Sequence, residues 1–126
     1  MSTKNTEGWI GVDLDGTLAH YESGQFPDIG PPVEDMVDRV NLWLAMEYNV
    51  KIFTARANNP KNLPAIRAWL AKSGIDGGES LEITATKDFD CMAIYDDRAV
   101  QVVKNTGQLV MKADAVTVPK DGPPMV

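Results

Sequence analysis

The chain has 126 residues, the length of one globular domain, and 44% of them are hydrophobic, as in an ordinary folded protein. Its 12 Lys and Arg residues against 18 Asp and Glu residues give a net charge of −6, which argues against extended binding to nucleic acid or to an anionic membrane. The single cysteine, Cys91, excludes an intramolecular disulfide, and no apolar run has the length that spans a bilayer. We therefore expect a soluble, cytoplasmic protein with no membrane partner.

The first hydrophobic segment, residues 9–14, contains β-branched residues and ends in an Asp-Gly-Thr sequence. This composition is typical of a buried strand that runs into a loop. Residues 19–32 are rich in glycine, proline and polar residues and predict a loop or small hairpin. Pro32 suits the first turn of a helix, and hydrophobic residues then recur every three or four positions from Val33 to Tyr48. The spacing predicts an amphipathic helix.

The second half of the chain repeats this alternation. Residues 50–53 predict a short strand that ends at Thr54, and helical spacing returns from Leu63 until Ser73 and Gly74. Two more short apolar segments, residues 81–84 and 92–95, predict a third and a fourth strand. We also expect a last helix over residues 99–104, a last small strand over residues 109–111, and a flexible proline-containing tail over residues 119–126.

Strands that alternate with helices favour right-handed crossovers and a parallel sheet. The expected fold is therefore a single α/β domain over residues 1–118, with an open, doubly wound, Rossmann-like parallel sheet and helices on both faces. In such sheets ligands bind beyond the carboxyl ends of the strands. The polar residues that follow each strand are therefore the candidates for a functional site.

Carboxylates, a hydroxyl and cations follow the predicted strands: Asp13, Asp15, Thr54, Arg56, Lys87, Asp96, Asp97 and Arg98. Several carboxylates in one cleft raise one another's pKa unless a counter-charge is present. Mg²⁺ fits an all-oxygen ligand set that lacks His and Cys, and it takes its remaining ligands from water or phosphate. A metal, a lysine and a hydroxyl donor together favour phosphoryl transfer.

The sequence Asp-Leu-Asp-Gly-Thr-Leu from Asp13 to Leu18, placed after a hydrophobic strand, resembles the first motif of the haloacid dehalogenase superfamily of phosphohydrolases. Thr54 is similar to the second motif and Lys87 to the third, while Asp96 and Asp97 resemble the acidic fourth motif. The four motifs stand in the family's order and cover residues 9–98. The resemblance implies a haloacid-dehalogenase-like fold and a Mg²⁺-dependent phosphatase.

In this family resemblance, Asp13 is the nucleophile that forms an aspartyl-phosphate. Asp15 is the general acid for the leaving group and then the base for water, and its backbone carbonyl binds the metal. Thr54 hydrogen-bonds a phosphoryl oxygen, and Lys87 balances the charge of Asp13 and the phosphate. The implied metal ligands are Asp13, Asp15, Asp96 and Asp97, with the order of the last two left open.

Gly16, Thr17 and Arg56 are the expected substrate-binding residues, because they adjoin the motif residues and offer backbone N–H groups, a hydroxyl and a cation. For Arg56, and for Arg98, an ion pair with a nearby acid is an equal alternative. Residues 19–28 correspond to the family's flap, in which His20 and Tyr21 are interpreted as ordinary loop residues. The intervals between motifs leave no space for a cap domain. The expected substrate is a small phosphorylated molecule, enclosed by a second subunit of a homo-oligomer, or an exposed phosphate on a macromolecule.

Two other functions use the same residue types. A receiver-like signalling domain also places Asp, Thr and Lys around Mg²⁺, but its phosphoacceptor follows the third strand, whereas here the Asp-x-Asp pair follows the first. A catalytically silent phosphate-binding module of the same fold has no need of an acid at Asp15. The order of the motifs and the presence of Asp15 therefore favour the hydrolase.

Overall fold

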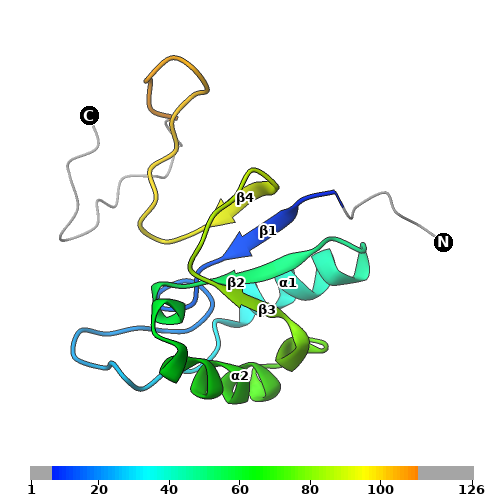
Figure 1. The fold of residues 1–126 in the computed structure, drawn as a ribbon, viewed down its shortest axis with the longest axis vertical. Coiled ribbons are helices and arrows are strands. Elements are labelled where there is room, and N and C mark those ends of the chain that lie inside the picture. The colour runs from blue at the N-terminus through cyan, green and yellow to red at the C-terminus, as the bar shows by residue number, and fades with distance from the viewer. Residues whose placement is uncertain (1–6, 111–126) are drawn as a thin grey trace. The chain divides into compact units, whose positions relative to one another are not determined.

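The computed structural model describes residues 7–110 and is α/β, with a four-stranded parallel sheet (Figure 1). The strand order is β3-β2-β1-β4, and every neighbouring pair is parallel. The elements are β1 (Trp9–Val12), α1 (Glu34–Ala45), β2 (Val50–Phe53), α2 (Leu63–Lys72), β3 (Glu82–Thr84) and β4 (Cys91–Tyr95). The predictions of an α/β fold and a parallel sheet are confirmed.

Strand β1 lies between β2 and β4 (Figure 1). Val12, its last residue, pairs with Ile52 of β2 and with Tyr95 of β4. The ladder with β4 continues one residue further, because the Asp13 N–H donates to the Tyr95 carbonyl at 2.9 Å. The residues that follow β1 and β4 therefore lie side by side at the carboxyl edge of the sheet.

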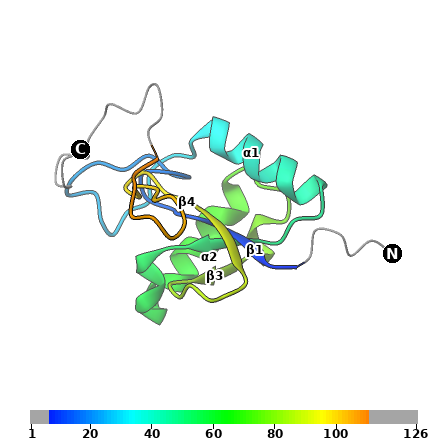
Figure 2. The ribbon, with the colours of Figure 1, turned by 90° about the horizontal axis from the view of Figure 1, so that it is seen from above.

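Both α-helices pack on the same face of the sheet. Alternation along the strands directs Ile10 and Val12 of β1, and their partners in β2, toward one side. These residues share one buried cluster with Val37 of α1 and Ile66 of α2. Figure 2 shows α1 running along one side of the strands. The prediction of helices on both faces is wrong for residues 7–110.

The physical reason lies in the order of the crossovers. The chain moves from β1 to β2 and on to β3 in one direction across the sheet, and right-handed crossovers then place both helices on one side. The return from β3 to β4 reverses that direction, but residues 85–90 form no helix. They cross the other face instead, where the Asp88 carboxylate accepts a 2.9 Å hydrogen bond from Trp9 Nε1.

Helix α1 begins at Glu34, two residues later than the sequence predicts. Pro32 lies before the helix and pairs with Ala19 in an isolated antiparallel bridge, so its assignment to the first turn is wrong. Helix α2 ends as predicted, with Ser73 at its C-cap and Gly74 at a left-handed φ of 92°. Within residues 7–110, no helix combines the length and the apolar character needed to cross a membrane.

The chain divides into two units after Asp96, and the second unit is described for residues 97–110. These residues contain no helix, so the prediction of a helix over residues 99–104 is wrong. Val102 and Leu109 form an antiparallel bridge, and the Val103 N–H donates to the Gln108 carbonyl at 2.7 Å. The turn depends on left-handed Asn105, with φ 67°, and Gly107, with φ 78°. Met111 and the predicted tail over 119–126 lie outside the described residues.

Candidate functional site

The loop that follows β1 is a tight turn with a fixed backbone. The N–H groups of Leu18 and Ala19 both donate to the Leu14 carbonyl, at 3.0 and 2.8 Å, and the Gly16 N–H donates to the Ala19 carbonyl at 2.8 Å. Leu14, Leu18 and Ala19 are fully buried and anchor the turn in the core. Gly16 has a φ of 89°, in the region that favours glycine.

Three carboxylates gather where β1 and β4 end. Asp13 directly follows β1, and Asp96 directly follows β4. One carboxylate oxygen from each of Asp13, Asp96 and Asp97 lies within 4.8 Å of the others. Asp13 and Asp96 are half-buried, whereas Asp97, which begins the second unit, is exposed. The structure thus brings together the first motif aspartate and both fourth motif aspartates.

The donor chemistry of this cluster fits a hard divalent cation. All three ligand atoms are carboxylate oxygens, and neither His nor Cys belongs to the cluster. Oxygen-only ligands suit Mg²⁺, which keeps several waters and binds through a few carboxylates rather than in a closed protein cage. Three anions at this separation also repel one another, and a divalent cation would offset that repulsion.

Asp15 is held apart from the cluster by an arginine. Arg56 Nε donates to Asp15 Oδ2 at 2.7 Å, and a second guanidinium nitrogen donates to Oδ1 at 2.8 Å. This is a bidentate ion pair, the geometry in which arginine binds carboxylates most strongly. The side chain of Arg56 is 6% exposed and that of Asp15 is 23% exposed. The carboxylate two residues after Asp13 thus has a fixed partner.

Arg56 makes further contacts with the loop of residues 19–32. Its guanidinium donates to the carbonyls of Pro27 at 2.7 Å and Asp28 at 2.9 Å, and it lies 4.8 Å from the centre of the Phe26 ring. The sequence predicts Arg56 as a substrate-binding residue of the site. In the structure, four of its guanidinium N–H groups are already bonded to protein, two of them to Asp15, which agrees with the alternative of an ion pair with a nearby acid.

Thr54 lies at the end of β2 and is 3% exposed. Its N–H donates to the Thr84 carbonyl at 2.9 Å, which fixes it against the end of β3. Its Oγ1 accepts from the Arg56 N–H at 3.2 Å and caps the 3-10 helix η1 (Ala55–Asn58). This cap determines where the Arg56 side chain leaves the backbone, so the predicted second motif positions the arginine that binds Asp15.

Lys87 does not join the cluster. It is exposed on the connection between β3 and β4, and among residues 7–110 it has no hydrogen bond or ion pair. The connection leaves the carboxyl edge at Thr84, and by Asp88 it has reached Trp9 at the start of β1. The structure therefore separates the predicted third motif from the other three.

The expected flap is a loop closed at its base. Ala19 pairs with Pro32, and the His20 N–H donates to the Pro31 carbonyl at 2.9 Å. Trp69 Nε1 on α2 donates to the Gly30 carbonyl at 2.8 Å. Thr17 is half-buried in the turn before this loop, and His20 and Tyr21 are exposed. The sequence predicts a loop or small hairpin over residues 19–32, and the structure shows a loop closed by the isolated bridge between Ala19 and Pro32.

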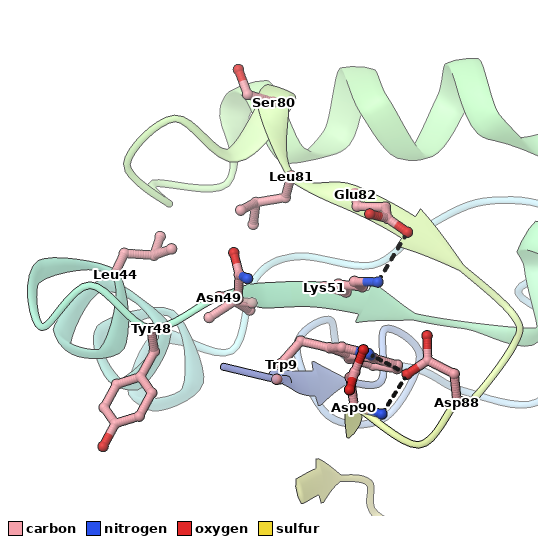
Figure 3. A pocket seen from close by; sticks show the side chains of 12 residues that line it. Trp9, Leu44, Tyr48, Asn49, Lys51, Ser80, Leu81, Glu82, Asp88 and Asp90 are labelled. Atoms are coloured by element: carbon pink, nitrogen blue, oxygen red, sulfur yellow. Dashed lines mark hydrogen bonds and ion pairs between the residues drawn. The ribbon is translucent and has the colours of Figure 1, made fainter. Parts of the chain in front are cut away.

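A hollow of about 470 Å³ lies at the opposite edge of the sheet from the carboxylate cluster (Figure 3). It is lined by residues that precede or begin the strands, including Trp9, Asn49 and Lys51. Lys51 pairs with Glu82 at 3.2 Å and lies 4.6 Å from the centre of the Trp9 ring. Because Lys51 contacts Glu82 and Trp9, and Trp9 donates to Asp88, we interpret the residues around this hollow as a structural network and not as a ligand site.

Asp88 gives this network a pH dependence. The Trp9 Nε1–H bond lowers the pKa of Asp88 below its ordinary value, with smaller contributions from backbone N–H groups and Lys51. A depressed folded pKa adds stability that is present above the unfolded pKa of about 3.9 and is lost as pH falls through the folded value. We expect Trp9→Phe to raise the pKa of Asp88, measured by NMR titration of its side-chain carboxyl. An unchanged titration would contradict this account.

Comparison of the chain with protein-family models, with curated proteins and with solved structures finds no match. Function is therefore inferred from the residues and their geometry.

Proposed function

We propose that the protein is a Mg²⁺-dependent phosphatase with a haloacid-dehalogenase-like active site, which hydrolyses a phosphate monoester through an aspartyl-phosphate. One observation carries the proposal: carboxylates that follow β1 and β4, distant in sequence, meet at the carboxyl edge of the sheet. The Asp-x-Asp turn adds a second carboxylate, Asp15, two residues after Asp13. A parallel sheet binds ligands at this edge.

In the first step, an Oδ atom of Asp13 attacks the phosphorus and the bond from phosphorus to the ester oxygen breaks. Asp15 donates a proton to that oxygen, so the alcohol leaves neutral and Asp15 becomes a carboxylate. Asp13 suits the nucleophile because it follows β1 directly and its backbone is fixed by the hydrogen bond to Tyr95. A fixed backbone holds the attacking oxygen in a narrow range of positions.

In the second step, Asp15 takes a proton from water while the water oxygen attacks phosphorus. The bond between phosphorus and Asp13 breaks, which releases inorganic phosphate and restores the Asp13 carboxylate. One carboxylate cannot both carry the phosphoryl group and move a proton, so two are needed. The turn supplies them two residues apart, with the fully buried Leu14 between them.

Asp13, Asp96 and Asp97, with the backbone carbonyl of Asp15, would hold the Mg²⁺. The bound cation supplies charge neutralisation for the phosphoryl oxygens. The N–H groups and hydroxyl of the turn at Gly16 and Thr17 would orient the phosphate. Thr54 would contribute a further hydroxyl. Lys87 stays the predicted charge-balancing residue, although it lies on the exposed connection of residues 85–90, away from the cluster.

Within residues 7–96, the longest connection between strands and helices is the loop of residues 13–33, and no cap domain is inserted between the described elements. An uncapped site favours a substrate whose phosphate projects from a small molecule or from a macromolecule. Cytoplasmic location and a homo-oligomer that completes the site remain part of this proposal. A receiver-like domain would instead keep the phosphoryl group, and a silent module would bind phosphate without turnover.

The metal site is tested by Asp96→Asn, with Asp38→Asn on the exposed side of α1 as the matched control. We expect Asp96→Asn to weaken Mg²⁺ binding by about tenfold or more, because even outer-shell changes have such effects. Asp38→Asn should bind as the original protein does, with both measured by isothermal titration calorimetry. Excess chelator should also abolish phosphate release from an aryl phosphate. Equal Mg²⁺ affinity in all three proteins would contradict the assigned ligands.

A further inference from the structure

We propose that Arg56 is a positioning residue that links Asp15 to residues 20–28, which are part of the loop of residues 19–32. The position of this part of the loop then controls the position of the acid/base carboxylate. The catalytic half of this inference rests on the proposed function. The structural half, a mechanical link between loop and carboxylate, does not.

The guanidinium of Arg56 is shared between the two partners. Two N–H groups bind both oxygens of Asp15, at 2.7 and 2.8 Å. Two more bind the carbonyls of Pro27 and Asp28, at 2.7 and 2.9 Å. The guanidinium is planar and rigid, so a shift of the loop carbonyls rotates or translates the whole fork. Such a shift cannot leave both bonds to Asp15 unchanged.

Because Arg56 is buried, separating it from Asp15 alone is energetically costly. Arg56 is almost fully buried, and Asp15 is the carboxylate that its charge faces. A buried cation that loses its hydrogen-bonded anion is left with an uncompensated charge. Phe26, itself 55% exposed, packs its ring against the guanidinium and thereby shields the pair from water on the loop side. A ligand that displaces Phe26 would expose and loosen the pair.

This arrangement has a consequence for catalysis. While both oxygens of Asp15 are bound to Arg56, the carboxylate is held on the side of the loop, and it must leave at least one of these bonds to reach an ester oxygen. A substrate that moves residues 20–28 therefore releases Asp15 as it binds. Arg56 acts through Asp15, and its remaining N–H capacity is too small for it to serve as the main phosphate ligand.

The link is tested by amide hydrogen exchange without metal or substrate. The reporters are Gln25 and Asp28, whose N–H groups donate within the loop, to the carbonyls of Glu22 and Gln25. We expect Arg56→Lys and Asp15→Asn each to raise their exchange rates by about tenfold or more, the effect of losing a hydrogen bond to a charged group. The double variant should exchange no faster than the faster single variant. Amides of α2 serve as the internal folding control.

Exchange at the reporters that is unchanged in Asp15→Asn would overturn the inference, because the Asp15 side chain reaches this loop through Arg56. If Arg56→Lys fails to fold, Asp15→Asn alone still decides the outcome, since it removes the charge and keeps the side-chain shape. Strictly additive effects in the double variant would also contradict a shared link.

Turnover separates this inference from the proposed function. We expect Arg56→Lys to lower kcat for an alkyl phosphate more than for an aryl phosphate, whose leaving group needs less protonation, with KM little changed. A rise in KM alone, with kcat retained, would show that Arg56 binds substrate directly and would overturn the positioning role. If the original protein hydrolyses neither ester, the proposed function fails, and the exchange experiment still decides the structural link.

Discussion

Replacing Asp13 with Asn is expected to lower phosphate release by roughly 10⁴- to 10⁶-fold, the scale of loss when a covalent nucleophile is removed. An amide oxygen is a poor nucleophile toward phosphorus, so no aspartyl-phosphate forms. The fold should persist, because the hydrogen bond between Asp13 and Tyr95 involves backbone atoms and Asn has the same shape as Asp. The loss of turnover is therefore expected to be chemical and not structural.

The measurement is phosphate release from an aryl phosphate with saturating Mg²⁺. Asp38→Asn on α1 is the control, because it makes the same change of charge at an exposed position away from the carboxyl edge. Thermal unfolding of the variants establishes that both are folded at the assay temperature. A well-folded Asp13→Asn protein with the turnover of the control would remove Asp13 from the nucleophile role.

The second large effect is expected from Asp15→Asn, which should slow turnover by about 10²- to 10⁴-fold, the usual contribution of a general acid or base. With an aryl phosphate the first step needs little protonation of the leaving group, whereas the attack of water still needs a base. We therefore expect phosphoenzyme to form and then persist. An alkyl phosphate should show a slower first step as well, because its leaving oxygen needs the proton.

Rapid-quench experiments measure both quantities, with phosphoenzyme detected by intact-protein mass and free phosphate detected in the supernatant. The expected result is a burst of phosphorylated protein followed by slow release. The same variant loses half of the charge pair with Arg56, so its unfolding temperature must be compared with the assay temperature. Multiple-turnover kinetics equal to those of the original protein would exclude Asp15 as the acid/base.

The sequence was sufficient to predict the elements that are set by local pattern. The continuous apolar run predicts β1, which is buried along its whole length, and the 3.6-residue spacing of hydrophobic residues predicts α1 and α2. Gly74 ends α2 because glycine readily adopts a left-handed φ. The meeting of Asp13 and Asp96 also followed from the sequence, because parallel strands bring their carboxyl ends to one edge. That prediction needed the strand identities but no knowledge of side-chain contacts.

The wrong predictions concern segments whose composition favours a helix but whose conformation is set by a turn or by a short connection. Residues 99–104 have helix-compatible composition, but Asn105 and Gly107 adopt left-handed φ values that close a turn and pair Val102 with Leu109. The helix expected on the second face is missing from residues 85–90, because that connection is too short to hold one. The same short connection takes Lys87 away from the carboxyl edge.

The sequence left Arg56 with two alternatives, a substrate anion or a nearby acid, and it did not identify Asp15 as that acid. Nothing local distinguishes an arginine that binds substrate from one that binds a carboxylate 41 positions away. A usable signal was the position of Arg56, two residues after Thr54 at the end of a buried strand. An arginine there is forced into the interior and must find an anion.

The most direct test of the account is to locate the phosphoryl group. The original protein is mixed with an aryl phosphate and Mg²⁺, quenched in acid during turnover, digested and analysed by tandem mass spectrometry. We predict a phosphoryl group on the peptide that contains Asp13, assigned to that residue and missing when chelator is added first. Turnover without a phosphorylated Asp13, or with the group on another residue, would contradict the central claim.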